Sequence, residues 1–173
     1  MDAIFELVQE GILQPTAEQV AQRAGVGTRT VFRHYADMES LFAEMQSRLE
    51  PEVRALLEGP PMEGPVEERV RQLVARRARV FERITPFRRS ANVQQVRSPL
   101  FQQGTAELDR EMRKQLREVL GPEIRAAQDD PLEILDMISS FEAWERLRGP
   151  QHLGRERAQR AVEQAVLAAL RSK

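Results

Sequence analysis

Cysteine is absent from this 173-residue chain, and aromatic residues make up only 5% of it. Without cysteine the protein has no disulfide, no thiolate nucleophile and no thiolate metal site. Its two histidines, His34 and His152, are too far apart in sequence to form a local pair of metal ligands. Phosphate-cradling glycine loops and nucleophile elbows are missing as well. We therefore expect a protein that is not an enzyme and that has no cofactor and no metal site.

Long apolar runs are missing too. No segment approaches the roughly 18 consecutive apolar residues of a membrane helix, and no basic segment followed by an apolar core marks a leader at the N-terminus. Apolar residues at 41% and charged residues at 31% are typical of a globular protein, long enough for one ordinary domain or two small ones. A cytoplasmic protein without a membrane partner is expected.

What the sequence does contain is helical periodicity, with neither strand-like alternation nor an internal repeat. The fold class is therefore predicted to be all-α, with about nine helices. We expect them near residues 3–10, 17–24, 28–35, 38–50, 66–84, 87–96, 100–120, 131–148 and 155–171. Prolines are expected to end or break helices at Pro51, Pro86 and Pro122, because proline lacks the backbone N–H that a helix interior uses.

The most informative stretch is residues 15–35, PTAEQVAQRAGVGTRTVFRHY. Thr16 can cap a helix, and Gln19 can reach back to the backbone of Thr16, which makes a capping box. Gly25 ends this helix, because the position after it needs a left-handed backbone that glycine adopts without steric cost. A second helix then begins at Gly27 or Thr28. The stretch predicts two helices joined by a three-residue turn.

The second helix of this stretch has two faces. Val31 and Tyr35, four residues apart, are expected to point into a small core, with Val26 filling the gap between the helices. The residues left to face outward are Thr28, Arg29, Thr30, Arg33 and His34.

The run AGVGTRTVFRHYADMESLF resembles the helix-turn-helix of the TetR (tetracycline repressor) family, with the turn at Gly25, the plug at Val26 and the core residue at Val31 in the family's spacing. The resemblance implies a recognition helix that enters the major groove of DNA. It implies that Thr28, Arg29 and Thr30 face base edges and that Phe32 and His34 lie beside phosphates. The residues expected to contact double-stranded DNA are Thr16, Thr28, Arg29, Thr30, Phe32, Arg33 and His34.

Three positions depart from the family pattern. Gly27 replaces a capping serine, Phe32 replaces a tyrosine whose hydroxyl can bond a phosphate, and Met38 replaces a lysine with the same use. Residues 1–50 also carry four basic against eight acidic side chains, a balance of −4, while the remainder carries +3. Because DNA affinity comes largely from neutralising phosphates, a second interpretation is a helical dimerisation or ligand-binding module whose helix-turn-helix no longer binds DNA tightly.

We predict a DNA-binding domain over residues 1–48 and a ligand-binding and dimerisation domain over residues 49–173. The basic run from Arg76 to Arg89 is either a solvated face or a site for an anionic ligand. Aromatic and thioether side chains nearby suggest a cavity for an apolar small-molecule effector, although the same residues can instead form ordinary core. The candidate ligand-binding residues are Phe81, Phe87, Phe101, Met112, Met137, Phe141 and Trp144.

Two helices close the chain. Asp129 and Asp130 precede Pro131 and are interpreted as a cap for the helix over 131–148, since nothing nearby completes a metal site. The helix over 155–171 has a narrow stripe of small apolar residues, which packs either within its own subunit or in a four-helix bundle with a second copy. The resembled family dimerises through its last two long helices. The resemblance implies a homodimer through these helices that reads a palindromic operator, most often as a repressor, and releases it when an effector binds.

Overall fold

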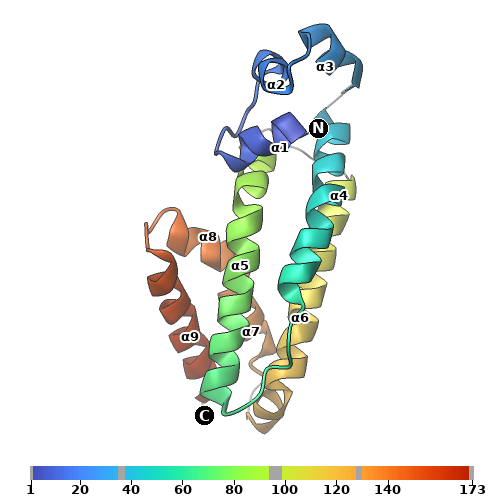
Figure 1. Ribbon diagram of the computed structural model, residues 1–173. Helices are drawn as coiled ribbons and strands as arrows, with labels where there is room; N and C mark the ends of the chain where they lie inside the picture. Colours follow the sequence, from blue (N-terminus) through green and yellow to red (C-terminus); the bar gives the residue numbers. More distant parts are fainter. Residues whose placement is uncertain (1, 35–37, 94–98, 128–129, 172–173) are drawn as a thin grey trace. The chain divides into compact units, whose positions relative to one another are not determined.

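The computed structural model describes residues 2–34, 38–93, 99–127 and 130–171, and the regular structure in these ranges is helical (Figure 1). The all-α prediction is therefore confirmed for the described part of the chain. The helices are α1 (Asp2–Gln9), α2 (Ala17–Ala24), α3 (Thr28–His34), α4 (Met38–Leu57), α5 (Val66–Val93), α6 (Pro99–Ala126), α7 (Leu132–Ile138), α8 (Phe141–Arg148) and α9 (Arg155–Arg171).

The chain divides into two compact units. The first consists of residues 1–54 and 82–105, and the second of residues 55–81 and 106–173. Helices α4, α5 and α6 each contribute residues to both units. The functional boundary expected between residues 48 and 49 stays a prediction, because it concerns which residues bind DNA rather than which residues pack together.

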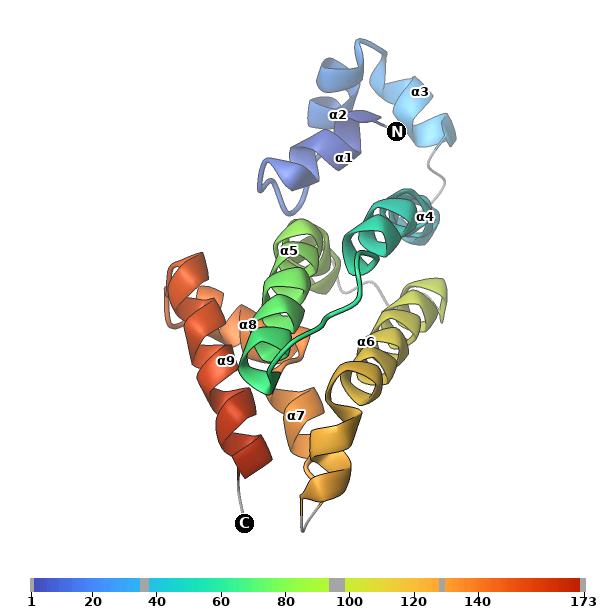
Figure 2. The same ribbon diagram turned by 60° about the horizontal axis from the view of Figure 1, so that its bottom comes forward.

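The first unit contains the three-helix head formed by α1, α2 and α3 (Figure 2). Its core includes Phe5 of α1 and Phe87 of α5, whose ring centroids lie 4.7 Å apart. The Arg83 guanidinium lies 5.1 and 5.3 Å from the centroids of these two rings and pairs with Glu52 of α4 at 2.7 Å. A cation held over two aromatic faces joins α1, α4 and α5.

The second unit has a separate core, made by α5, α6, α7 and α9 with Val70, Leu73, Leu116, Leu135 and Val166 among its fully buried residues. Polar contacts at its edge tie the same helices together. Arg69 of α5 donates to the Glu123 carboxylate and to the Val119 carbonyl of α6.

Interior prolines do not end helices as predicted. Pro51 lies inside α4, Pro86 inside α5 and Pro122 inside α6, so that the helices expected over 66–84 and 87–96 are one. An interior proline costs about 3 kcal/mol. Beyond Pro86, however, Phe87 and Ala91 are buried in the first core, and burying one large apolar side chain contributes about 1.5–3 kcal/mol. Packing of the continuing stripe therefore offsets much of the cost of the proline.

The single helix predicted over 131–148 is two helices, so that prediction was wrong. They are separated at Ser139 and Ser140, and the Ser140 hydroxyl caps α8 by accepting from the Ala143 N–H at 3.2 Å. Serine favours such a start because its oxygen satisfies an N–H that has no helical partner. The Asp130 carboxylate accepts from the Leu132 N–H at 2.9 Å, as expected of a cap, whereas Asp129 lies outside the described residues.

Candidate nucleic-acid interface

The turn between α2 and α3 is built from local signals. The Thr16 hydroxyl accepts from the Gln19 N–H at 3.2 Å, and the Gln19 side-chain oxygen accepts from the Thr16 N–H at 2.8 Å. Gly25 then adopts φ 66° and ψ 30°, in the left-handed region, and its N–H donates to the carbonyls of the last turn of α2. The capping box and the left-handed glycine predicted from the sequence are both confirmed.

Helix α2 is fixed to α1 by an arginine. Arg23 pairs with Glu10 at 2.7 Å and with Glu6 at 3.3 Å. The hydrogen bonds that Arg23 donates to these two carboxylates raise the pKa of Arg23, and the bond to Glu10 lowers the pKa of Glu10. Below this pair, Val20 and Val31 are buried in the first core and hold α2 and α3 together. Arg23 is therefore already paired within the head, with carboxylates of α1.

Arg48 is occupied in the same way. It pairs with Asp2 of α1, and its guanidinium lies 4.9 Å from the centroid of the Phe5 ring. Ion pairing of Arg23 and Arg48 with acids of α1 leaves the balance of −4 for residues 1–50 unchanged, because both arginines are already counted in it. Of the four basic side chains in that segment, Arg29 and Arg33 are the two on α3, and neither forms an ion pair with another residue that the structure describes.

Helix α3 exposes most of the residues predicted to contact DNA. Thr28, Arg29 and Arg33 are exposed, Phe32 is 66% exposed, and Thr30 is half-buried. Arg29 and Arg33 are one helical turn apart and so lie on the same side of α3. Two further candidates lie elsewhere: Thr16 is exposed at the start of α2, and His34 ends α3, where its side chain is outside the described residues, as are Tyr35 and the Met38 side chain.

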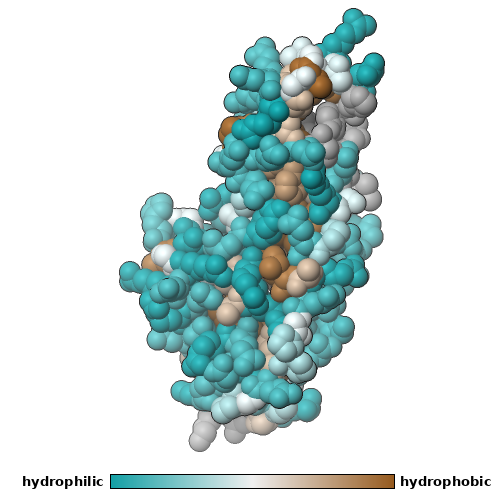
Figure 3. Space-filling view, in the orientation of Figure 1, coloured by the Kyte–Doolittle hydropathy of each residue, from teal (hydrophilic) through white to brown (hydrophobic). Residues whose placement is uncertain are grey.

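The surface around the turn is not entirely polar. Figure 3 shows hydrophilic side chains over most of the face drawn, with hydrophobic groups at several places, one of them in the region of α2 and α3. The exposed large apolar residues there are Val26, 43% exposed, and Phe32. Val26 was expected to fill the gap between the helices, but it lies outside the first core, to which Val20, Ala21 and Val31 belong.

Three of the predicted ligand-binding residues meet in the second unit. The Phe81 ring centroid lies 5.8 Å from that of Phe141 and 6.2 Å from that of Trp144, and all three side chains are buried. Met112 is buried on α6 in the same unit. The others do not join this cluster: Phe87 belongs to the first core and Met137 is 64% exposed on α7, while the Phe101 side chain is outside the described residues.

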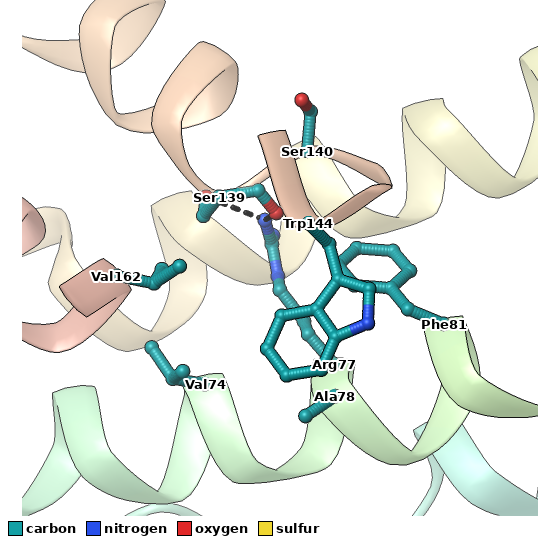
Figure 4. A pocket seen from close by; sticks show the side chains of 8 residues that line it. All are labelled: Val74, Arg77, Ala78, Phe81, Ser139, Ser140, Trp144 and Val162. Carbon is teal, nitrogen blue, oxygen red and sulfur yellow. Dashed lines mark hydrogen bonds between the residues drawn. The ribbon is translucent and has the colours of Figure 1, made fainter. Parts of the chain in front are cut away.

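A small pocket lies beside this aromatic cluster (Figure 4). The space inside it that a water molecule can occupy is about 10 Å³, which is room for about one water. Its lining is mainly apolar, with three polar residues, and consists of Val74, Arg77, Ala78, Phe81, Ser139, Ser140, Trp144 and Val162.

Sequence reasoning missed Arg77, because it treated the basic run from Arg76 to Arg89 as one surface. Arg77 is 2% exposed, whereas Arg76 reaches the carbonyls of Leu57 and Pro60, and Arg83 pairs with Glu52. The signal was the spacing: position 77 follows Leu73 by four residues and precedes Phe81 by four, on the apolar stripe of α5.

Comparison with known proteins identifies the head. Residues 1–45 match the family described as "Bacterial regulatory proteins, tetR family", a match that covers α1, α2, α3 and the start of α4. No curated protein and no solved structure matches the chain.

The ranges that the structure describes contain no helix with both the length and the apolar character needed to cross a bilayer. They likewise hold no cluster of three or more histidine, cysteine, aspartate or glutamate side chains suited to a metal ion.

Proposed function

We propose that this chain, a DNA-binding transcriptional regulator of the tetR family, is a cytoplasmic, ligand-responsive repressor that binds a palindromic operator as a homodimer and acts by binding rather than by catalysis. The observation that carries the proposal is the exposed side of α3. There Arg29 and Arg33 lie one turn apart with no ion pair among the described residues, while Arg23 and Arg48 are held by acids of α1.

Recognition of DNA is assigned to α3. In helix-turn-helix proteins the N-terminal residues of the second helix contact base edges in the major groove, which here are Thr28, Arg29 and Thr30. Arginine can donate two hydrogen bonds to guanine, so Arg29 is the proposed base-reading residue. Arg33, one turn further on, lies where phosphates flank the groove. Phe32, His34 and Thr16 are assigned to backbone contacts, with Phe32 contributing apolar surface only.

The proposed homodimer has its interface at residues 131–148 and 155–171. Support comes from α7, where Ile134 is 52% and Met137 is 64% exposed, so that apolar surface remains for a second copy to cover. Much of the small-residue stripe on α9 serves its own subunit, because Ala158, Val162 and Val166 are buried there and Ala169 and Leu170 pack against the second core. In the dimer the two recognition helices would be separated by about one turn of DNA, ~34 Å.

Release of DNA is proposed to follow binding of a small molecule in the second unit, at the pocket beside Phe81 and Trp144. A ligand shifts the equilibrium between two arrangements only if it binds one of them more tightly. The DNA-competent arrangement is therefore proposed to have the lower affinity for the effector.

Two observations favour a second function, that of a helical dimerisation or ligand-binding module that binds DNA weakly. The first 50 residues carry a balance of −4, and Phe32 offers no hydroxyl to a phosphate. Fluorescence anisotropy of labelled duplexes at low salt separates the two functions, because a DNA-binding regulator binds with an affinity that falls steeply as salt is added.

The same assay tests the assignment of Arg29. Replacing Arg29 by alanine should cost about 1–3 kcal/mol of discrimination at one base-pair position, whereas loss of the His34 side chain should weaken binding to all sequences alike. Arg54→Ala is the matched control, because Arg54 is an exposed arginine on α4 that pairs with Glu50 and lies outside α3. If Arg29→Ala and Arg54→Ala lose the same discrimination between base pairs, Arg29 does not recognise bases. If the unaltered protein does not bind DNA even at low salt, the second function, a dimerisation or ligand-binding module, is the one supported.

A further inference from the structure

Phe32 is the one exposed ring among the aromatic side chains that the structure describes. Its exposed fraction of 66% is the largest among the exposed large apolar residues, and it takes no part in the first core. The other described rings are buried: Phe5, Phe81, Phe87, Phe141 and Trp144. An exposed ring contributes little to the stability of the head, because it removes little apolar area from water.

The neighbours of Phe32 on α3 are the side chains assigned to DNA. Thr28 and Arg29 precede it by four and three residues, so both lie on its side of the helix. Arg33 follows it directly, and neither Arg29 nor Arg33 forms an ion pair with another residue that the structure describes. The exposed ring therefore belongs to a surface whose charge suits the phosphates of DNA.

A phenylalanine ring can offer DNA apolar contact only, since it has no hydroxyl for a phosphate. Base edges in the major groove present mainly hydrogen-bond donors and acceptors, and the apolar group among them is the C5-methyl of thymine. This methyl lies on the side of the base pair nearest the backbone of its own strand. A ring that lies beside phosphates is therefore placed to reach it.

We propose that Phe32 recognises the C5-methyl group of a thymine in the operator, at a base pair next to the one that Arg29 contacts. The inference rests on the proposed function, since it adds a second specificity-determining residue to the same recognition helix. The contact buries apolar surface of both partners, so it distinguishes thymine from a base without the methyl group and needs neither a charge nor a hydrogen bond.

Replacing thymine by deoxyuridine tests the contact, because this change removes the methyl group and keeps the hydrogen bonds of the base pair. A duplex selected from random DNA is labelled, its thymines are replaced one at a time, and binding is followed by fluorescence anisotropy. At one thymine of each half-site we expect binding about fourfold weaker, the value for one buried carbon group. If no replacement weakens binding, the proposal is overturned.

Two variants assign the methyl contact to the ring. Phe32→Ala should bind the thymine and deoxyuridine duplexes alike, whereas Phe32→Tyr keeps the ring and should keep the preference for thymine. A preference that survives in Phe32→Ala, or one that is lost in Phe32→Tyr, contradicts the assignment. The comparison of the two duplexes with the unaltered protein is decisive even if a variant does not fold.

Arg33→Ala is the matched control on the same helix. Loss of a phosphate contact should reduce the slope of log K against log[salt] by about 1 and leave the thymine preference unchanged. Phe32→Ala should show the reverse, with the slope unchanged and the preference lost, because the ring carries no charge. A slope reduced equally in both variants would contradict a methyl contact.

The outcomes separate this proposal from the proposed function. Salt-dependent binding to duplexes without any thymine preference refutes the Phe32 contact alone and leaves a DNA-binding regulator. A protein that binds no duplex even at low salt refutes both the base-reading role of α3 and the contact of Phe32.

Discussion

Replacing Gly25 by alanine tests the turn that sets α3 against α2. Gly25 has φ 66° and ψ 30°, a conformation in which a residue with a Cβ is destabilised by roughly 1–2 kcal/mol. A Cβ added at this position meets no atom within 4 Å, so the cost comes from the backbone alone. Alanine also restricts the unfolded chain, which offsets about 0.4–1 kcal/mol. We expect Gly25→Ala to lower the free energy of unfolding by about 1 kcal/mol.

Urea unfolding followed by circular dichroism measures this change. With a slope of about 1–3 kcal/mol per molar urea, the midpoint should fall by roughly 0.3–1 M, with the slope unchanged. Gly25→Asn is the matched control, because asparagine tolerates the left-handed region and should lose less than alanine. A Gly25→Ala protein as stable as the original, or an asparagine variant less stable than the alanine variant, would refute the left-handed turn.

Three further predictions concern the stability of the head and of α4. Thr16→Ala should lower the free energy of unfolding by about 1 kcal/mol, and Gln19→Ala should lower it less, because that variant keeps the hydroxyl cap. If Thr16→Ala and the original protein are equally stable in urea, the capping box is contradicted. Pro51→Ala should raise stability by about 2 kcal/mol, because alanine restores a helical N–H at an exposed position, and a lower urea midpoint would show that α4 needs the proline. The hydrogen bond from Arg23 lowers the pKa of Glu10, so this pair stabilises the fold fully above the unfolded pKa of about 4.3 and loses its effect as the pH falls through the folded pKa. In Glu10→Gln the urea midpoint should therefore fall less between neutral and acid pH than in the original protein. An identical fall in both proteins would contradict the pairing.

Most of the head could be predicted because its signals are local. The capping box needs two residues three positions apart, and the end of α2 needs one glycine. The outward face of α3 follows from the burial of Val31, although Val26 is more exposed than its spacing indicated. The base and phosphate contacts assigned to α3 stay predictions.

The body was harder to predict because its decisive contacts join residues distant in sequence. The continuation of α5 past Pro86 depends on a core that Phe87 shares with Phe5 of α1. The polar partners of Arg77 lie 35 and 62 residues further along the chain. Helical periodicity places position 77 on the apolar stripe of α5, but the positive charge of an arginine predicts a side chain at the surface.

Selection of binding sites from random duplex DNA tests the central claim most directly, namely that α3 of a homodimer reads a palindromic operator. The account predicts enrichment of an inverted repeat whose half-sites lie about one helical turn apart, ~34 Å. Selection with Arg29→Ala should give the same repeat with relaxed preference at one position of each half-site. No enriched sequence, or enrichment that does not change when Arg29 is lost, would contradict the account.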